Sequence, residues 1–102
     1  MWIKMADAEK IARAFKVLSV DTRVKIVQLL KARALCVNAL SHHLGVTPAA
    51  VSQHLRVLRD ADVVIPEKRG YFVHYRLNGK TLRRWKELTH QLLKGERTGK
   101  RR

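Results

Sequence analysis

The residues best suited to chemistry lie in the middle of the chain, where small and polar side chains recur at helical spacing. They are Ala49, Ser52, Gln53 and Arg56. At about 100° per residue, these four positions fall on one side of a helix. A glutamine amide pairs well with adenine, an arginine guanidinium with guanine and a serine hydroxyl with either, while alanine permits close approach to a thymine methyl group. The spacing therefore predicts a helix face that reads base edges in a DNA major groove.

The other side of the same segment is apolar, which indicates how the polar side would be held outward. Val51, Leu55 and Leu58 fall together there, as expected of residues that anchor a helix to a core. Thr47 followed by Pro48 is a strong helix start, because threonine caps the first amides and proline suits the first helical position. The helix start at Thr47 would also present unpaired amide groups to a DNA phosphate.

Charge bears on the choice between this interpretation and an ordinary solvated helix face. Lys and Arg number 22 against 8 Asp and Glu, which gives a net charge of +14. Such an excess favours a polyanion, with nucleic acid the leading candidate, although an acidic membrane surface would satisfy the charge alone. The single cysteine excludes an intrachain disulfide and fits a reducing, cytoplasmic setting. No apolar run predicts a membrane span, and the N-terminus does not resemble a signal peptide.

Hydrophobic spacing and local start and stop signals predict the surrounding elements. Helices are expected at 6–18, 23–32, about 38–44, 48–61 and 80–93, with a short extended piece at 35–37. Asp21 and Asn38 are expected to cap the second and third helices. The last helix would start at Asn78 or Thr81, and Gly45 would end the third in a left-handed conformation. A short helix, a tight connection and a second helix predict a helix-turn-helix.

Beyond the helix-turn-helix, the hydrophobic period changes to that of a strand. Residues 63–65 and 71–77 are predicted as strands joined by a turn at 66–70. Lys68 and Arg69 in that turn would suit contact with a phosphate or with the minor groove. The alternative is an ordinary charged turn, because any hairpin tip favours charge.

These elements predict one mainly α fold: an α+β winged helix of five helices with a two-stranded β-hairpin wing. A single domain is expected over residues 1–94, because the chain is long enough for only one modest core. Residues 95–102 read as a basic, flexible tail.

The stretch from residue 21 to residue 77 resembles the ArsR/SmtB family of winged-helix repressors. The most specific part is the Val-Ser-Gln-His-Leu string at 51–55, followed by leucine at 58, and the likeness continues through 69–77. The resemblance implies a homodimeric repressor that an inducer releases from its operator DNA. Two-fold symmetry would place two recognition helices about 34 Å apart on a pseudo-palindromic operator.

The resemblance also implies that the first and last helices pair across the dimer axis. The apolar residues that would form this interface are Ile11, Phe15, Trp85, Leu88 and Leu92. The alternative is that they only complete the core of the monomer. One departure from the family pattern is Asp62, where glycine commonly follows the recognition helix. Aspartate tolerates the left-handed region, so the turn is expected to survive.

Metal sites known in the family are not rebuilt by this sequence. A Cys-Val-Cys pair reads Cys36-Val37-Asn38 here, so the second thiol is missing, and soft ions generally want two or more thiolates. The ligand positions of the family's other site, on the last helix, become Gly79, Thr81, Leu92 and Gly95. The five histidines do not replace either set. We expect no metal and no cofactor, with Cys36 a small apolar residue rather than a ligand or redox switch.

The function expected from the sequence is a sequence-specific DNA-binding transcriptional regulator, most simply a repressor. Its partners would be double-stranded DNA and a second copy of the chain, with an inducer left open and no membrane. The alternative is an architectural DNA-binding protein without a preferred site, which the charge of +14 also suits. An enzyme is not expected, because no arrangement suited to acyl transfer and no phosphate-binding glycine loop is present.

Overall fold

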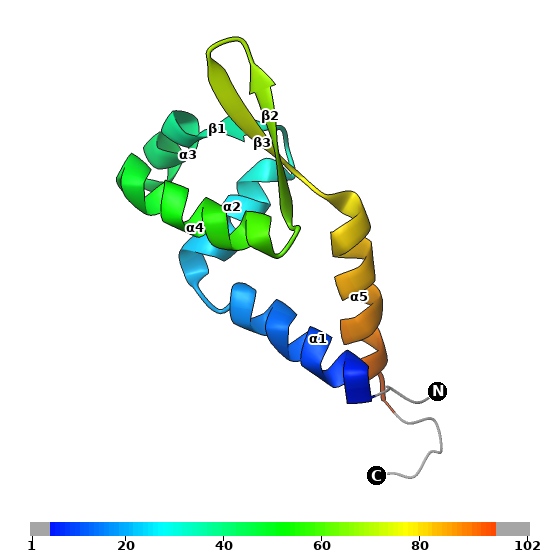
Figure 1. Cartoon of the computed structure of the whole chain (residues 1–102). Helices are drawn as coiled ribbons and strands as arrows, with labels where there is room; N and C mark the ends of the chain where they lie inside the picture. The colour runs from blue at the N-terminus through cyan, green and yellow to red at the C-terminus, as the bar shows by residue number, and fades with distance from the viewer. Residues whose placement is uncertain (1–4, 96–102) are drawn as a thin grey trace.

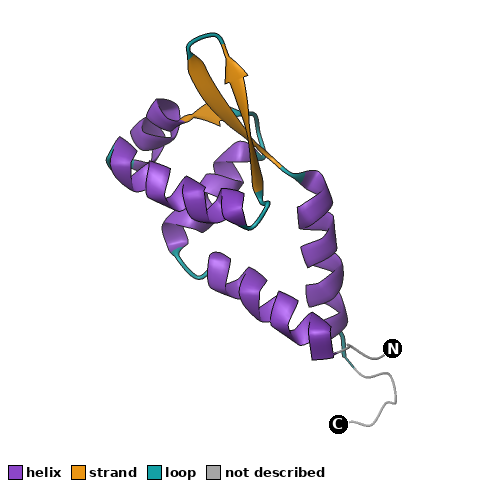
Figure 2. Cartoon of the chain, viewed as in Figure 1, coloured by secondary structure: helices purple, strands orange, loops and turns teal. Residues whose placement is uncertain are grey.

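The computed structural model describes residues 5–95, which form five helices and a small antiparallel sheet (Figures 1 and 2). The helices are α1 (Met5–Val17), α2 (Asp21–Leu30), α3 (Val37–Leu44), α4 (Pro48–Asp60) and α5 (Gly79–Leu93). The strands are β1 (Leu35–Cys36), β2 (Val64–Arg69) and β3 (Phe72–Leu77). The predicted winged-helix class is therefore confirmed. The predicted tail lies outside the described residues, apart from Gly95, and the division into domain and tail stays a prediction.

The sheet contains one strand more than the predicted two-stranded wing. Its order is β1-β3-β2, and both pairings are antiparallel. β1 is the segment expected to be extended, and it pairs Leu35 with Tyr75 and Cys36 with His74. A two-residue strand is too short to show an alternation of apolar and polar residues. Its pairing with a distant strand also depends on tertiary structure, so the sequence did not predict it.

The hairpin is also longer than predicted, and its turn is tighter. β2 runs through residues 66–69, which the sequence had placed in the turn, and Pro66 pairs with Tyr75. Because β2 is an edge strand, proline is tolerated there without breaking the sheet. The turn itself consists of Gly70 and Tyr71, with Gly70 at a φ of 64°.

Two of the predicted helix caps are wrong. α2 is capped at Val20 and α3 at Cys36, and neither cap makes a side-chain hydrogen bond. Asp21 is instead the first residue of α2, where its carboxylate lies 3.7 Å from the Lys25 ammonium. Asn38 lies within the first turn of α3. Both residue types suit the first turn as well as the cap, so type alone misplaces the boundary.

Three other predicted boundaries are confirmed. The Thr47 hydroxyl accepts a hydrogen bond from the Ala50 amide over 3.1 Å and caps α4. The Asn78 side chain accepts from the Lys80 amide over 3.2 Å and caps α5. Gly45 ends α3 with a φ of 67°, in the left-handed region that glycine tolerates best.

α4 ends in a Schellman motif that also fixes the base of the wing. Asp62 has a φ of 61°, as expected of a residue that replaces glycine there. Its amide donates to the Arg59 carbonyl over 2.9 Å, and the Val63 amide donates to the Leu58 carbonyl over 2.8 Å. The Val63 carbonyl accepts from the Asn78 amide over 2.8 Å. Val63 therefore joins the end of α4 to the start of α5 through its own backbone.

The core lies between α2, α3, α4 and the sheet, which together we call the head. Its buried residues are Ile26, Leu30, Leu35, Leu40, Val51, Leu55, Leu58, Val63 and Val64, joined by Val17 from the end of α1. We call α1 and α5 the arm, which extends away from the head in Figure 1. α1 and α5 contact each other, but α5 contributes no buried residue. No helix within residues 5–95 is long and apolar enough to cross a membrane.

Candidate DNA-binding surface

The helix-turn-helix consists of α3, the connection at residues 45–47 and α4. Val51, Leu55 and Leu58 on α4 are 0%, 2% and 0% exposed, so they anchor the helix to the core as predicted. The Ser41 hydroxyl donates to the Val46 carbonyl and ties the end of α3 to the connection. Because both ends of the connection are fixed, α4 is held at one angle to α3.

The opposite side of α4 is exposed and forms a single surface. One shallow hollow of about 260 Å³ is lined by the four residues that the spacing had grouped: Ala49, Ser52, Gln53 and Arg56. All four are exposed, and no other element of residues 5–95 lines that hollow. The predicted geometry of an uncovered polar face on α4 is therefore present.

The start of α4 offers less to a phosphate than the sequence suggested. Pro48 has no amide hydrogen, the Ala50 amide is bonded to the Thr47 hydroxyl, and the Val51 amide is bonded to the Thr47 carbonyl. The Ala49 amide is left as the first-turn donor without a partner among the described residues. The exposed Thr47 hydroxyl keeps its own hydrogen to donate. One amide and one hydroxyl, rather than several amides, are available there.

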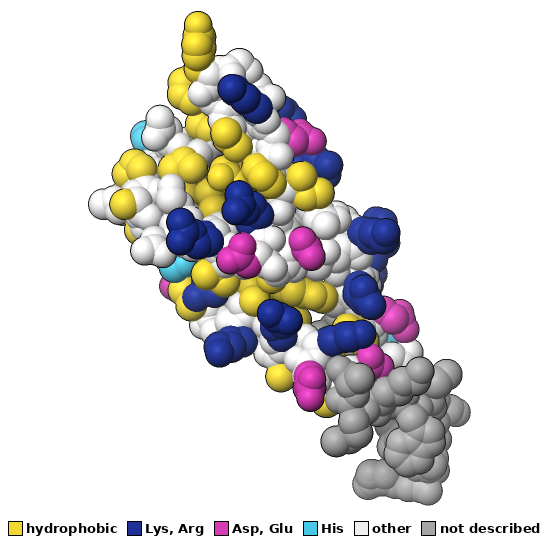
Figure 3. All heavy atoms as spheres, viewed as in Figure 1, with side chains coloured by type: hydrophobic (Ala, Val, Ile, Leu, Met, Phe, Trp, Pro, Cys, Tyr) yellow, Lys and Arg dark blue, Asp and Glu magenta, His cyan; other side chains and the backbone are white. Residues whose placement is uncertain are grey.

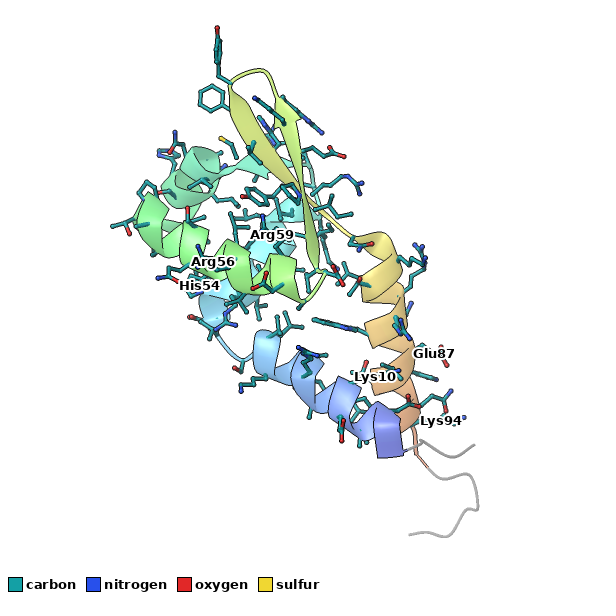
Figure 4. All side chains as sticks on the ribbon, viewed as in Figure 1. Lys10, His54, Arg56, Arg59, Glu87 and Lys94 are labelled. Atoms are coloured by element: carbon teal, nitrogen blue, oxygen red, sulfur yellow. The ribbon has the colours of Figure 1, made fainter. Side chains whose placement is uncertain are left out.

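Two arginines on α4 carry charge that no carboxylate neutralises within the described part of the chain. Arg56 and Arg59 are both exposed, and Figure 4 shows them on the same helix. The ion pairs recorded for residues 5–95 involve Lys25, Arg69 and Arg76 instead. The sequence analysis missed Arg59, although its place three residues after Arg56 puts it on a neighbouring part of the helix surface.

Lys68 and Arg69, the two cations predicted for the wing, differ in whether a carboxylate pairs with them. Glu67 lies 3.2 Å from the Arg69 guanidinium and 2.5 Å from that of Arg76. Hydrogen bonds from Arg76 first, and then from Arg69, hold the pKa of Glu67 below its usual range. Lys68 is exposed and has no acidic partner among the described residues. Lys68 is therefore the better of the two for phosphate contact, while Arg69 is partly committed to the hairpin.

The outer end of the wing is apolar, which the sequence analysis also missed. Tyr71 is 99% exposed, and Phe72 and Val73 are 54% and 41% exposed. Figure 3 shows hydrophobic side chains at this upper end of the molecule, with basic side chains farther down. The sequence signal for this apolar end is the Gly-Tyr-Phe order at the hairpin turn. That order predicts a turn followed by a strand, but it does not by itself predict how exposed the aromatic side chains are.

Cys36 and the histidines do not assemble into a metal centre within the described residues. Cys36 is half-buried on β1, and its partner across the sheet is His74 on β3. The Nδ1 atom of His74 is buried without a hydrogen-bond partner. No three His, Cys, Asp or Glu side chains gather closely enough in residues 5–95 to hold an ion.

The residues predicted for dimer contact lie on both helices of the arm and are unequally exposed. Phe15 and Leu92 are 46% and 45% exposed, while Trp85 and Leu88 are half-buried. Ile11 is only 4% exposed, so it belongs to the packing of the monomer and offers little surface to a partner. A hollow of about 450 Å³ between α1, α5 and the end of α2 is lined mostly by apolar residues, among them Phe15, Trp85 and the exposed Leu93.

Comparison with known proteins assigns this architecture to a family. The model of the bacterial regulatory proteins of the arsR family matches residues 21–65, which contain the whole helix-turn-helix. The transcriptional repressor SdpR of Bacillus subtilis is 34% identical over 63% of this chain and 71% of its own length. This chain belongs to the ArsR family. It spans only about half the length (51–57%) of three further relatives, which regulate arsenic or cadmium resistance.

Solved structures place the ArsR-family chain in the same winged-helix fold. A possible transcriptional regulator for arsenical resistance is 38% identical with a TM-score of 0.71, over 76% of this chain and 81% of that one. A homodimeric winged helix-turn-helix domain from Mycobacterium bovis covers 100% of this chain and 99% of its own, with a TM-score of 0.69. At 20% identity the second likeness shows the fold alone. The ArsR-family chain is thus a DNA-binding transcriptional regulator by family and fold.

Proposed function

We propose that this ArsR-family chain is a repressor that binds a pseudo-palindromic operator as a homodimer. The observation that carries the proposal is a row of exposed residues on α4. Three buried residues on the other side of the same helix hold this row outward. The row consists of Ala49, Ser52, Gln53 and Arg56. SdpR, of which the chain spans 71%, is a transcriptional repressor. A uniform electrostatic contact would not require such a positioned set of amide, hydroxyl and guanidinium groups.

Each residue of the row has a role that its chemistry suits. Gln53 reads an adenine, Arg56 reads a guanine through its two parallel donors, and Ser52 bonds to a base or phosphate nearby. Ala49 lets the helix sit deep in the groove and offers its amide to a phosphate. The Thr47 hydroxyl binds the same stretch of backbone. These contacts specify a half-site, while Lys68 and, less strongly, Arg69 hold the flanking duplex.

The arm supplies the second half of the proposal. α5 is a 15-residue amphipathic helix without a buried residue, and its apolar side continues onto Phe15 of α1. Side chains of this size gain free energy when a partner covers them, at roughly 25 cal/mol for each Å² of apolar surface removed from water. Pairing of two arms would cover Phe15, Trp85, Leu88 and Leu92 and would set the spacing of two α4 helices.

The first test measures specificity. The full chain is used to select duplexes from a random library, and its affinity for a selected duplex is compared with that for a scrambled one at one salt concentration. A repressor of the proposed kind should favour the selected duplex by about a thousandfold or more. Equal affinity for the two, with a steep salt dependence, would instead establish the architectural alternative that the charge of +14 suits.

Variants on α4 then assign the contacts. Gln53→Ala and Arg56→Ala should each weaken binding to the selected duplex by about 1–3 kcal/mol and relax the preference at one base pair. The matched control is Arg83→Ala, which removes one exposed positive charge from α5. If Arg83→Ala weakens selected and scrambled duplexes as much as Arg56→Ala does, the assignment of base reading to α4 fails.

A further inference from the structure

The geometry of the wing places one aromatic ring at its outermost point. β2 and β3 stay paired as far as Arg69 and Phe72, so the turn contains only two residues. Gly70 takes the left-handed conformation that such a tight turn requires, with a φ of 64°. Tyr71 is the other residue of the turn and is 99% exposed. Tyr71 therefore lies at the tip of the wing with its side chain in solvent.

Charge does not explain what stands at this tip. Tyr71 is followed by Phe72 and Val73, which are 54% and 41% exposed, so three apolar residues in succession meet water. Of the nearby cations, Arg69 and Arg76 are both held by Glu67. Contact with a phosphate would therefore use Lys68 and leave the aromatic end of the wing unexplained. Exposed apolar patches of this kind mark contact sites.

Hydrogen bonds also link the two strands of the hairpin and fasten its base to the rest of the head. Glu67 on β2 is bonded to Arg76 on β3 and so links the two strands near their middle. At the base, the Val63 backbone bonds to Leu58 of α4 and to Asn78 at the start of α5. A contact group on such a support needs little further ordering when it binds.

We propose that Tyr71 is a specificity-determining residue that inserts its ring into the DNA minor groove beside the half-site read by α4. The proposal rests on the proposed function and names double-stranded DNA as the partner of the wing tip. The net charge of +14 and the continuity of the tip with Lys68 favour DNA over another surface. Apolar side chains in the minor groove partly unstack a base step, which costs least at flexible pyrimidine–purine steps.

The consequence is a sequence preference at a position that no residue of α4 touches. A TA step and an AA step present nearly the same acceptors in the minor groove, so hydrogen bonding scarcely separates them. They differ in deformability, because TA steps kink easily and A-tracts are stiff and narrow. Tyr71 should therefore favour a TA step beside the half-site, and the ring rather than the hydroxyl should be responsible.

The test compares four chains on two selected duplexes that differ only in a TA or AA step flanking the half-site. The chains are the wild type, Tyr71→Ala, Tyr71→Phe and Lys68→Ala. The wild type and Tyr71→Phe should prefer TA by about three- to tenfold, and Tyr71→Ala should bind both duplexes equally, because only the ring gains from a deformable step. Lys68→Ala should keep the preference but lower the slope of log affinity against log salt by about one.

A fluorescent base provides a readout that a merely structural role for Tyr71 would not move. With 2-aminopurine in place of the flanking adenine, unstacking should raise the emission when the wild type binds, and Tyr71→Ala should leave the emission low. Circular dichroism should show Tyr71→Ala folded as the wild type is, because the side chain is 99% exposed and supports nothing.

The outcomes separate this inference from the proposed function. If the wild type binds selected and scrambled duplexes equally, the proposed function fails first. If the wild type discriminates but Tyr71→Ala keeps its affinity, its TA preference and its 2-aminopurine signal, the role of Tyr71 alone is overturned. It is equally overturned if Tyr71→Ala changes only self-association or binding to anionic lipid vesicles, because the tip then serves a different partner.

Discussion

The head and the arm of this ArsR-family chain differ in how completely each is packed within one protomer. In the head, α4 buries Val51, Leu55 and Leu58, and the strands of the sheet close over the same core. In the arm, α1 buries Ile11 and Ala14, but α5 has no fully buried residue, and its apolar side chains are exposed or half-buried. The head thus closes over its core within one protomer, with Val17 of α1 included, whereas the arm keeps exposed apolar surface that a second protomer would cover under the proposed function. Under the proposed function, the head reads DNA and the arm sets the distance between the two DNA-reading helices of a dimer.

The largest effect should follow from a change in the head. Leu58→Ala removes a side chain that is 0% exposed at the end of α4 and leaves a cavity. The free energy of unfolding should fall by about 2–5 kcal/mol, as for other leucine-to-alanine changes in cores. Urea denaturation measures it, and the loss should be the same at every protein concentration. A loss below about 0.5 kcal/mol would show that the head is packed less tightly than described.

A change in the arm should act on assembly instead. Leu92→Asp places a charge on the exposed apolar side of α5, so the dimer should dissociate while the head stays folded. Without the second half-site contact, operator affinity should fall by about a hundredfold. Sedimentation and operator titration measure the two effects, with His90→Asp, which adds the same charge at another exposed position of α5, as the control. If sedimentation shows that the wild type is a monomer, the proposed difference between the head and the arm is wrong.

The cap of α4 should contribute less than either. Thr47→Ala removes the hydroxyl that accepts from the Ala50 amide, and the free energy of unfolding should fall by about 1 kcal/mol. Thr47→Ser keeps an oxygen at the same place and should retain most of the stability. If serine proves as damaging as alanine in urea denaturation, the methyl group rather than the hydrogen bond matters.

The smallest effect concerns the wing and depends on pH. Because the pKa of Glu67 is lowered by Arg76 and Arg69, the stabilising contribution of its carboxylate is present above the unfolded pKa and is lost as pH falls through the folded one. Backbone amide shifts of β2 and β3 should therefore change at acid pH in the wild type. Glu67→Gln should show that spectrum already at neutral pH, and identical acid titrations of both chains would contradict the assignment.

Local signals predicted α4 well, because they act within a few residues. The Thr47-Pro48 start, the stop at Gly45 and the division of α4 into two faces all followed from neighbouring side chains. Apart from the misplaced caps of α2 and α3, the failures involve distant partners. The pairing of β1 with β3 and the strand character of Pro66 depend on segments elsewhere in the chain. The ion pair between Glu67 and Arg76 depends on the pairing of β2 with β3. This pairing continues through the charged residues that the sequence predicted as a turn.

The exposure of each contact was also hard to read from residue type. Ile11 and Phe15 look alike as apolar positions of one helix, yet they are 4% and 46% exposed. Tyr71 looked like the start of a strand and is instead the tip of the wing. Exposure depends on how helices and strands are arranged around the core, and spacing along one segment does not contain that arrangement.

The backbone bonds of Val63 have a mechanical consequence. Because Val63 is bonded both to the last turn of α4 and to the cap of α5, α4 and the base of the wing are expected to move as one rigid unit. The angle between them is then set before any duplex arrives. A signal that lowers the affinity of a dimer for DNA would then have to change how the two protomers are arranged. The two α4 helices would no longer match the spacing of the DNA helical repeat.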